Sequence, residues 1–191
     1  MPDPAPVTQR AAAAARTRDA LLEAGLTLAE RIPLPRISAN VVVAAAGVSK
    51  GTFFHHFPTR ADYLVALHET FHDRLEREIA TLARDCPPGP ERLHKATELY
   101  LDRCLRDASV RTLLIDARTE PGVAQAAQHR TDATAEHLIP DFTALGSATP
   151  RASAQLWIRL VREAALLEAD AGHRLEALRA ALADFVRPTR R

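Results

Sequence analysis

Residues 38–64, SANVVVAAAGVSKGTFFHHFPTRADYL, predict two short helices joined by a tight turn and followed by the start of a third helix. Ser38 is a suitable N-cap for the first helix, and Gly47 suits the left-handed conformation that ends many helices. Ser49 provides a second N-cap. Pro58 ends the second helix, because proline lacks an amide hydrogen. The stretch therefore predicts a helix-turn-helix unit.

A longer helix is expected directly after this unit. Thr59 and Asp62 form a capping box of the T-x-x-D kind. Apolar residues three and four positions apart then continue from Tyr63 to Leu75, which is the spacing of one helix face.

The second helix of the unit has two different faces. Phe53 and Phe57 are four residues apart and turn inward, whereas residues 50–52 form an exposed first turn that carries a cation, a glycine and a hydroxyl group. A helix with such a surface fits the major groove of DNA. On spacing alone, an ordinary helical hairpin with a polar end is the alternative.

The stretch resembles the DNA-binding domain of the TetR family of bacterial transcriptional regulators. That family's motif runs from an apolar residue and alanine through A-G-V-S and a small or basic pair to T-[LF]-Y-x-H-F and a basic residue. Here, residues 41–60 read VVVAAAGVSKGTFFHHFPTR. Upstream, RDALLEAGLTLAER at residues 18–31 is similar to the family's first helix. The resemblance is specific over these segments and loose afterwards, where partners differ.

The resemblance implies which residues contact DNA, position by position. Base and phosphate contacts concentrate on residues 50–52, and a basic residue at position 60 meets phosphate. The positions that match are Asn40, Ser49, Lys50, Gly51, Thr52, Phe54, His55, His56 and Arg60. Arg10, Arg16 and Arg18 in the N-terminal segment are further candidates for phosphate contacts, with simple solvation as the alternative.

Two features depart from the family pattern. Phe54 replaces the usual tyrosine, so the hydroxyl group that bonds a phosphate is absent and one modest hydrogen bond is lost. RIPLPRIS, residues 31–38, replaces the usual glycine-containing link between the first two helices, and Pro33 and Pro35 stiffen it.

The rest of the sequence predicts an all-α protein. The chain has 191 residues and 47% apolar content, enough for a buried core, and alternating β-branched runs are few. Pro140 should kink or end the helix that Pro121 opens, and Ser109 and Thr149 are expected caps. We expect a flexible tail at residues 1–13, the DNA-binding domain at residues 14–74, and a ligand-binding and dimerisation domain at residues 75–191.

Charge distribution and cysteine content indicate the binding partner and the cellular compartment of the protein. The net charge is +1, but residues 1–60 carry +3 and the remainder carries −2, which fits a DNA-facing end as well as ordinary surface scatter. Cys86 and Cys104 are too few for a disulfide framework, so we expect a reduced, cytoplasmic protein. No apolar run is long enough for a membrane span.

The last two helical segments indicate a homodimer. ASAQLWIRLVREAALLEA at residues 152–169 and LEALRAALADFV at residues 175–186 each carry an apolar stripe. The resemblance implies that this pair packs against its copy as a four-helix bundle, and small residues would allow close approach. Those small residues are Ala164, Ala165, Ala177 and Ala181. Burial of both stripes within one subunit is the alternative.

The resemblance also implies a cavity for a small-molecule effector between about residues 59 and 170. The candidates for its lining are Tyr100, Cys104, Phe142 and Trp157, although each is also a plausible core residue. Polar residues that would orient a ligand, or else lie at the surface, are His94, Arg111, Arg118 and His137. His68, His72 and Glu76 share one helix face, but one helix supplies too few ligands for a tetrahedral metal site. We predict no metal and no cofactor.

These features together predict a homodimeric repressor that a small-molecule effector releases from a near-palindromic operator in double-stranded DNA. Activation is the alternative mode of regulation. An architectural DNA binder without an effector is a second hypothesis. An enzyme is the third, but the sequence has no G-x-S-x-G, H-E-x-x-H or glycine-rich phosphate loop.

Overall fold

The computed structural model describes residues 5–187, and within them it contains helices and no strands, which confirms the all-α class. The first four α-helices are α1 (Ala5–Ala29), α2 (Ala39–Ala46), α3 (Lys50–His56) and α4 (Arg60–Ala83). The remaining α-helices are α5 (Pro90–Arg106), α6 (Ala108–Asp116), α7 (Pro121–Ala144), α8 (Pro150–Ala171) and α9 (Glu176–Phe185). Two 3-10 helices, η1 (Leu34–Arg36) and η2 (Ala117–Thr119), lie between them.

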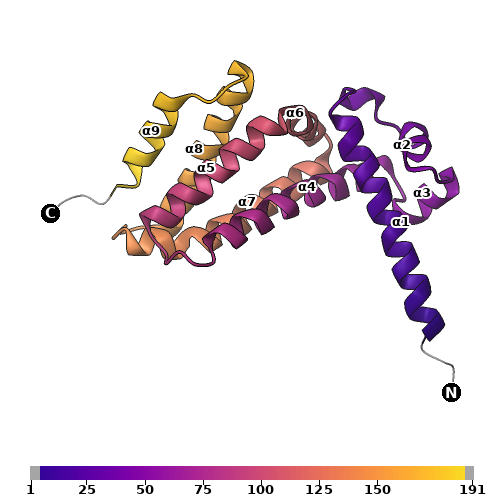
Figure 1. Ribbon diagram of the computed structural model, residues 1–191, viewed down its shortest axis with the longest axis horizontal. Helices are drawn as coiled ribbons and strands as arrows, with labels where there is room; N and C mark the ends of the chain where they lie inside the picture. Colours follow the sequence, from indigo (N-terminus) through magenta and orange to yellow (C-terminus); the bar gives the residue numbers. More distant parts are fainter. Residues whose placement is uncertain (1–4, 188–191) are drawn as a thin grey trace.

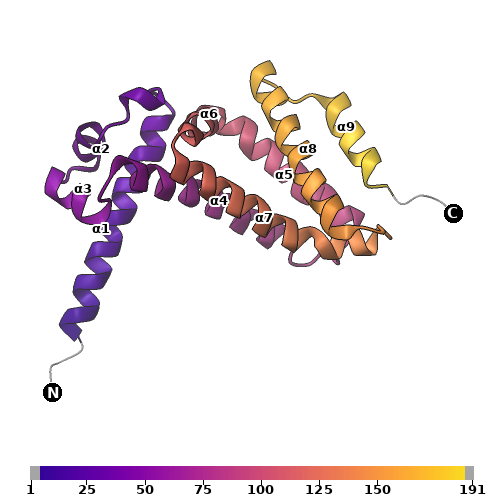
Figure 2. The ribbon, with the colours of Figure 1, turned by 180° about the vertical axis from the view of Figure 1, so that it is seen from behind.

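The molecule has a small N-terminal group of helices at one end and an elongated helical body (Figure 1). α1, α2 and α3 form the N-terminal group, and α4 runs from that group along the body beside α7 (Figure 2). α4 passes through the predicted domain boundary between residues 74 and 75 without interruption. The division into domains stays a prediction.

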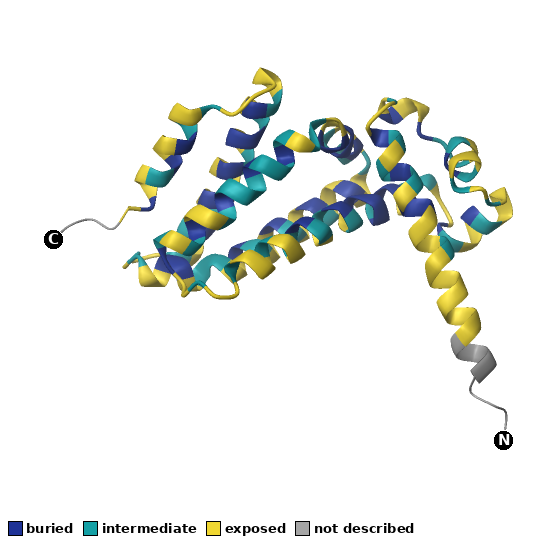
Figure 3. Ribbon diagram, in the orientation of Figure 1, coloured by how far each residue is buried: buried dark blue, intermediate teal, exposed yellow. Residues whose placement is uncertain are grey.

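Buried side chains form two cores, as the dark segments of Figure 3 indicate. The first core lies under the N-terminal group and includes Leu21, Val42, Phe53 and Tyr63. Residues of α6, η2 and α7 also belong to it, so this core joins the N-terminal group to the body. The second core lies between α5, α7, α8 and α9.

Local hydrogen bonds explain the ends of the short helices. The amide of Thr52 donates to Ser49 Oγ at 3.1 Å and so caps α3, and Ser38 caps α2 in the same way. Gly47 has φ of 67°, the left-handed conformation expected after α2. The capping box of Thr59 and Asp62 is complete at the start of α4. These caps were predicted correctly.

The expectation of a flexible tail at residues 1–13 requires correction. α1 begins at Ala5, and residues 5–13 form its first turns; the remainder of that prediction, residues 1–4, lies outside the described residues. The physical reason is composition: residues 11–15 are all alanine, the residue with the highest helix propensity.

Local predictions in the body have different outcomes. α7 continues through Pro140 to Ala144, so the proline does not end this helix. α6 begins before Ser109, so the prediction that Ser109 caps it is wrong. Thr149 is the N-cap residue of α8, as predicted, although its side chain makes no capping hydrogen bond. Tertiary packing positions these helices instead.

No helix in residues 5–187 combines the length and apolar character that a membrane crossing requires.

Candidate DNA-binding surface and ligand cavity

α3 presents one face to the core and the other to solvent. Phe53 and Phe57 are each 1% exposed, and their rings lie 5.1 and 5.0 Å from the ring of Tyr63. The aromatic cluster fixes the rotation of α3 about its axis. Lys50 and Phe54 consequently lie on the exposed face, together with Gly51 and His55.

Cationic and imidazole groups surround this exposed face. The Lys50 ammonium lies 6.0 Å from the centre of the Phe54 ring, and the Arg18 guanidinium of α1 lies 5.2 Å from the centre of the Phe57 ring. Partial burial, and then the neighbouring His55 and Arg18, lower the pKa of His56. Arg18 is thus the N-terminal arginine that approaches α3, whereas Arg10 and Arg16 lie exposed farther along α1.

The remaining predicted contact residues lie near this face, with one exception. Asn40 is exposed on the first turn of α2, and Ser49 and Thr52 are bonded to each other at the start of α3. Arg60 differs, since its guanidinium is used inside the protein. It donates to the carbonyl oxygens of Leu34 and Ile37 at 3.1 Å each and pairs with Glu120 at 3.2 Å.

The phosphate-contact role expected for Arg60 stays a prediction, and the structure gives this side chain internal partners as well. Its hydrogen bonds hold the link between α1 and α2 against the start of α7, and no sequence signal near Arg60 indicates these distant partners. These hydrogen bonds use three of the guanidinium nitrogen donors of Arg60, so Arg60 helps to position the helix-turn-helix unit.

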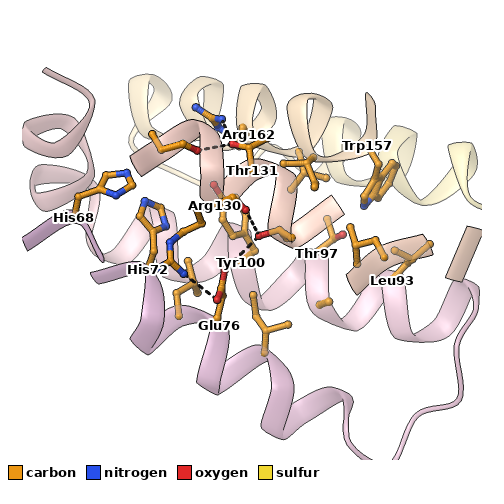
Figure 4. Close-up of a pocket in the computed structure, with 18 of the residues that line it drawn as sticks. His68, His72, Glu76, Leu93, Thr97, Tyr100, Arg130, Thr131, Trp157 and Arg162 are labelled. Carbon is orange, nitrogen blue, oxygen red and sulfur yellow. Dashed lines mark hydrogen bonds and ion pairs between the residues drawn. The ribbon is translucent and has the colours of Figure 1, made fainter. Parts of the chain in front are cut away.

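A cavity of about 140 Å³ lies in the body between α4, α5, α7 and α8 (Figure 4). Polar groups gather at one end, where the rings of His68 and His72 lie 4.4 Å apart near Arg130 and Arg162. Leu93 and Trp157 lie at the other end. Its lining consists of His68, His72, Leu75, Glu76, Ile79, Leu93, Ala96, Thr97, Tyr100, Arg118, Ala127, Arg130, Thr131, Thr134, Leu138, Trp157, Ile158, Val161 and Arg162. The cavity is therefore amphipathic.

Charge and burial keep both imidazoles at the polar end neutral. Burial, and then the positive charges of Arg118, Arg130 and Arg162, lower the pKa of His68 to about 4. Burial and the same neighbours also hold the pKa of His72 well below its usual value. His68 is 1% exposed, and neither of its ring nitrogens has a hydrogen-bond partner among the described residues. The ring is available to a ligand.

Comparison with known proteins places the N-terminal helices in a family. Residues 21–67 match the family model described as bacterial regulatory proteins, tetR family. The helix-turn-helix segment of the chain thus matches the TetR family. The matched residues run from α1 through the first turns of α4 and contain the entire helix-turn-helix unit.

Two curated relatives support this assignment. An uncharacterized HTH-type transcriptional regulator of Mycobacterium bovis is 28% identical over 113 residues, or 57% of each chain. The HTH-type transcriptional regulator CymR of Pseudomonas putida is 33% identical over 96 residues, which are 48% of this chain and 46% of CymR. The chain spans about half the length of the curated relatives it matches.

A solved structure matches the TetR-like fold over most of the chain. A transcriptional regulator from Rhodococcus sp. Rha1 superposes with a TM-score of 0.75 at 24% identity. The match covers 88% of this chain and 93% of that one. The likeness extends the shared fold to the body.

The cavity in the body includes two of the four predicted lining residues. Tyr100 and Trp157 line it. Cys104 and Phe142 do not: both are buried in the second core, where Phe142 packs edge-on against Trp157 at 6.3 Å and burial raises the pKa of the Cys104 thiol. The prediction for these two residues requires correction, because helix periodicity separates a buried face from an exposed one and does not separate core from cavity.

Of the four polar residues predicted to orient a ligand, the two arginines lie at or beside the cavity and the two histidines do not. Arg118 lines the cavity, and Arg111 lies directly beside it in a smaller space that Arg118 and Arg162 share. His94 and His137 are exposed and lie outside the cavity. Arg130 and Arg162 are lining residues that the sequence analysis missed. Their partners in the cavity, Thr131 for Arg162 and Glu76 for Arg130, lie on other helices, so the local sequence contains no signal for them.

His68, His72 and Glu76 do share one face of α4, and all three line the cavity. In residues 5–187, no group of three or more histidine, cysteine, aspartate or glutamate side chains is placed to hold a metal ion. Glu76 instead pairs with Arg130 at 2.9 Å.

α8 and α9 expose an apolar surface. Leu156, Leu160 and Leu167 of α8 are 69%, 39% and 44% exposed, and Phe185 of α9 is 71% exposed. Ala177 and Ala181 are exposed on α9 as expected for close approach, but Ala164 and Ala165 are at most 2% exposed. These two alanines belong to the second core, so their expected place in a dimer interface requires correction.

Proposed function

We propose that this TetR-family protein is a cytoplasmic, homodimeric repressor that a small-molecule effector releases from a near-palindromic operator. The observation that carries the proposal is the exposed face of α3. Phe53 and Phe57 hold the other face of α3 in the core. Lys50, Gly51 and His55 therefore face outward, at the position of a recognition helix. The amphipathic cavity in the body supports an effector site.

The contacts of Arg60 offer a physical connection between the two sites. Arg118 lines the cavity from η2, and Glu120, two residues later, pairs with Arg60. Arg60 in turn holds the carbonyl groups of Leu34 and Ile37, directly before α2. A ligand that shifts Arg118 would act on the segment that positions the helix-turn-helix unit. Linkage then requires that DNA and effector weaken each other's binding by the same factor.

Replacement of Lys50 by alanine tests the DNA-binding surface. We expect a loss of about 1–3 kcal/mol of binding free energy on the cognate operator and relaxed specificity at one base pair, because we propose that Lys50 contacts a base edge. Gly51 beside it lets the helix approach the groove floor. Fluorescence anisotropy with operator and scrambled duplexes at several salt concentrations measures both effects.

The matched control is Lys95→Ala, since Lys95 is the other lysine of the chain and pairs with Glu91 on α5. This variant should bind DNA like the wild type. If Lys50 instead contacts phosphate, its loss should weaken all sequences alike and reduce the salt slope by about one unit. Unchanged binding of Lys50→Ala to every duplex would remove α3 from the DNA interface.

The exposed leucines of α8 support the proposed dimer. An apolar surface on two adjacent helices gains free energy when a second copy covers it. The double variant Leu156→Glu, Leu160→Glu places two charges in this interface, and we expect it to sediment as a monomer at micromolar concentration. Leu82→Glu is the control, because Leu82 is 43% exposed on α4, away from this surface. An undisturbed dimer in the double variant would rule out the α8–α9 interface.

Two rival functions have distinct signatures. An architectural DNA binder would bind DNA without release by any small molecule. An enzyme would show turnover of a substrate, and the cavity contains no serine or cysteine nucleophile among its lining residues. A metabolite screen for release of the selected operator separates the regulator from both.

A further inference from the structure

Positive charge at the polar end of the cavity lacks an opposing carboxylate. Arg162 donates to the hydroxyl of Thr131 at 3.1 Å, and Arg111 donates to the carbonyl oxygen of Arg162 at 3.1 Å. Neither these two arginines nor Arg118 forms an ion pair with a carboxylate of residues 5–187, and Nε of Arg118 has no partner there. Burial, followed by the charge of Arg162, lowers the pKa of Arg118.

The one carboxylate in the lining is already neutralised. Glu76 pairs with Arg130 at 2.9 Å and accepts a hydrogen bond from Thr134 at 3.2 Å. Arg130 is also paired with Asp73, which is outside the lining. An incoming anion therefore meets Arg118 and Arg162 without competition from a free carboxylate of the lining.

The neutral ring of His68 adds a hydrogen-bond donor beside these cations. It is 1% exposed, faces the cavity and has no partner for either nitrogen in the described structure. Buried polar atoms of this kind cost free energy unless a ligand or water satisfies them. His68 and Arg162 lie at the same end of the cavity (Figure 4), and Arg118 is close enough for its charge to lower the pKa of His68.

The opposite end is apolar and compact. Leu93 and Trp157 lie there (Figure 4), Leu138 and Ile158 are further apolar residues of the lining, and the whole cavity measures about 140 Å³. A cavity of about 150 Å³ with an apolar lining accommodates benzene. The whole cavity thus suits a small ligand, of about one aromatic ring in size.

We infer that the cavity takes an organic carboxylate, with its carboxylate held between Arg118 and Arg162 and a compact apolar body against Trp157 and Leu93. Guanidinium groups match a planar carboxylate through paired hydrogen bonds, which favours this anion. The inference rests on the proposed function for its biological role, because it names the chemical class of the effector.

Titration of the full chain with benzoate and 3-phenylpropanoate, each against its primary amide, tests the inference. The amides keep the shape and remove the charge. Trp157 is the single tryptophan, so its emission reports occupancy, and calorimetry gives affinity. We expect at least one of the acids to bind about 10-fold or more tightly than its amide. Equal affinity of acid and amide, or no binding of either acid, would overturn the assignment.

Matched variants locate the charge. Arg118→Gln and Arg162→Gln should each weaken the acid about 10-fold and leave the amide unchanged. Arg159→Gln, on the exposed side of α8, should bind like the wild type. An acid preference that survives in both Arg118→Gln and Arg162→Gln would show that these arginines do not hold the carboxylate.

A second measurement needs no ligand. Because Arg118 is held near other cations without a counter-charge, Arg118→Gln should raise the thermal midpoint of the ligand-free protein by about 2–4 °C, whereas Arg159→Gln should leave it unchanged. A lowered midpoint would contradict the uncompensated charge at Arg118.

Operator binding separates this inference from the proposed function. If an acid binds in an Arg118-dependent manner but leaves the operator bound, the carboxylate site stands and the effector role of the cavity fails. If an uncharged compound occupies the cavity and releases the operator while the acids do not bind, the effector role stands and the carboxylate class is overturned.

Discussion

Replacement of Arg179 by leucine should lower the free energy of unfolding by about 3–5 kcal/mol. Arg179 of α9 is 4% exposed, and its guanidinium donates to both oxygens of Glu168, which is fully buried on α8, at 2.7 and 2.6 Å. It also pairs with Glu98 and Asp102 of α5. The leucine variant leaves the Glu168 carboxylate buried without its cation. α9 then loses its main polar attachment to the body.

The pH dependence of this loss identifies its cause. Burial alone would raise the pKa of Glu168, but hydrogen bonds from Arg179 and from the amide of Leu175 lower it below its usual value. The wild type therefore keeps this stabilisation above the unfolded-state pKa and loses it as the pH falls through the lower folded-state pKa. In Arg179→Leu, burial raises the folded-state pKa instead. The difference between variant and wild type should shrink as the pH falls to about 4.

Urea unfolding at neutral and acidic pH measures both effects. Arg174→Leu is the control, because Arg174 pairs with the same Glu98 and Asp102 but is exposed, and exposed pairs contribute about 0–1 kcal/mol. The double variant Arg179→Leu, Glu168→Leu should recover a large part of the loss. A loss below 1 kcal/mol for Arg179→Leu would show that the buried network does not hold α9.

Replacement of Gly25 by alanine should destabilise the protein by about 2–4 kcal/mol, although alanine is the better helix former. A Cβ atom at Gly25 of α1 would lie 1.9 Å from the hydroxyl oxygen of Tyr63. That hydroxyl is buried and donates to the carbonyl oxygen of Leu21 at 2.9 Å. The methyl group must displace the ring or break this bond, and either change disturbs the core under α3.

Two further variants make the Gly25 prediction specific. Gly25→Ala combined with Tyr63→Phe removes the hydroxyl and should recover part of the loss. Gly122→Ala of α7 is the matched helical control, since its Cβ would meet only Val65 at 3.4 Å, and its stability should stay within about 1 kcal/mol of the wild type. Thermal unfolding of these three variants and of the wild type measures the stability differences. A Gly25→Ala variant as stable as the wild type would mean that Tyr63 does not pack against this position.

The predictable part of the fold rests on local signals. The interactions that bound α2, α3 and the start of α4 each join residues no more than four positions apart. They involve Ser38, Gly47, Ser49 and the capping box of Thr59, so a short stretch of sequence shows both partners of each interaction. The family motif lies on the same segment. This explains why the helix-turn-helix unit was predicted correctly while the predicted cap of α6, Ser109, was wrong.

The cavity depends on contacts between residues far apart in the chain. Arg162 meets Thr131 of α7 across 31 positions, and Arg130 meets Glu76 of α4 across a longer separation. Helix periodicity cannot reveal such pairs. The same limit applies to Arg60, whose partners lie before α2 and after η2. Sequence reasoning found Tyr100, Trp157 and Arg118 but missed Arg130 and Arg162, which add to the charge of the cavity.

The central claim is that a dimer presents two copies of α3 to successive turns of the DNA major groove. Hydroxyl-radical footprinting of the full chain on a duplex selected from genomic DNA tests this claim most directly. We expect two protected patches on one face of the duplex, separated by one helical turn of about 10–10.5 base pairs or a whole number of turns. Uniform protection that is independent of sequence, or a single patch at saturation, would contradict it.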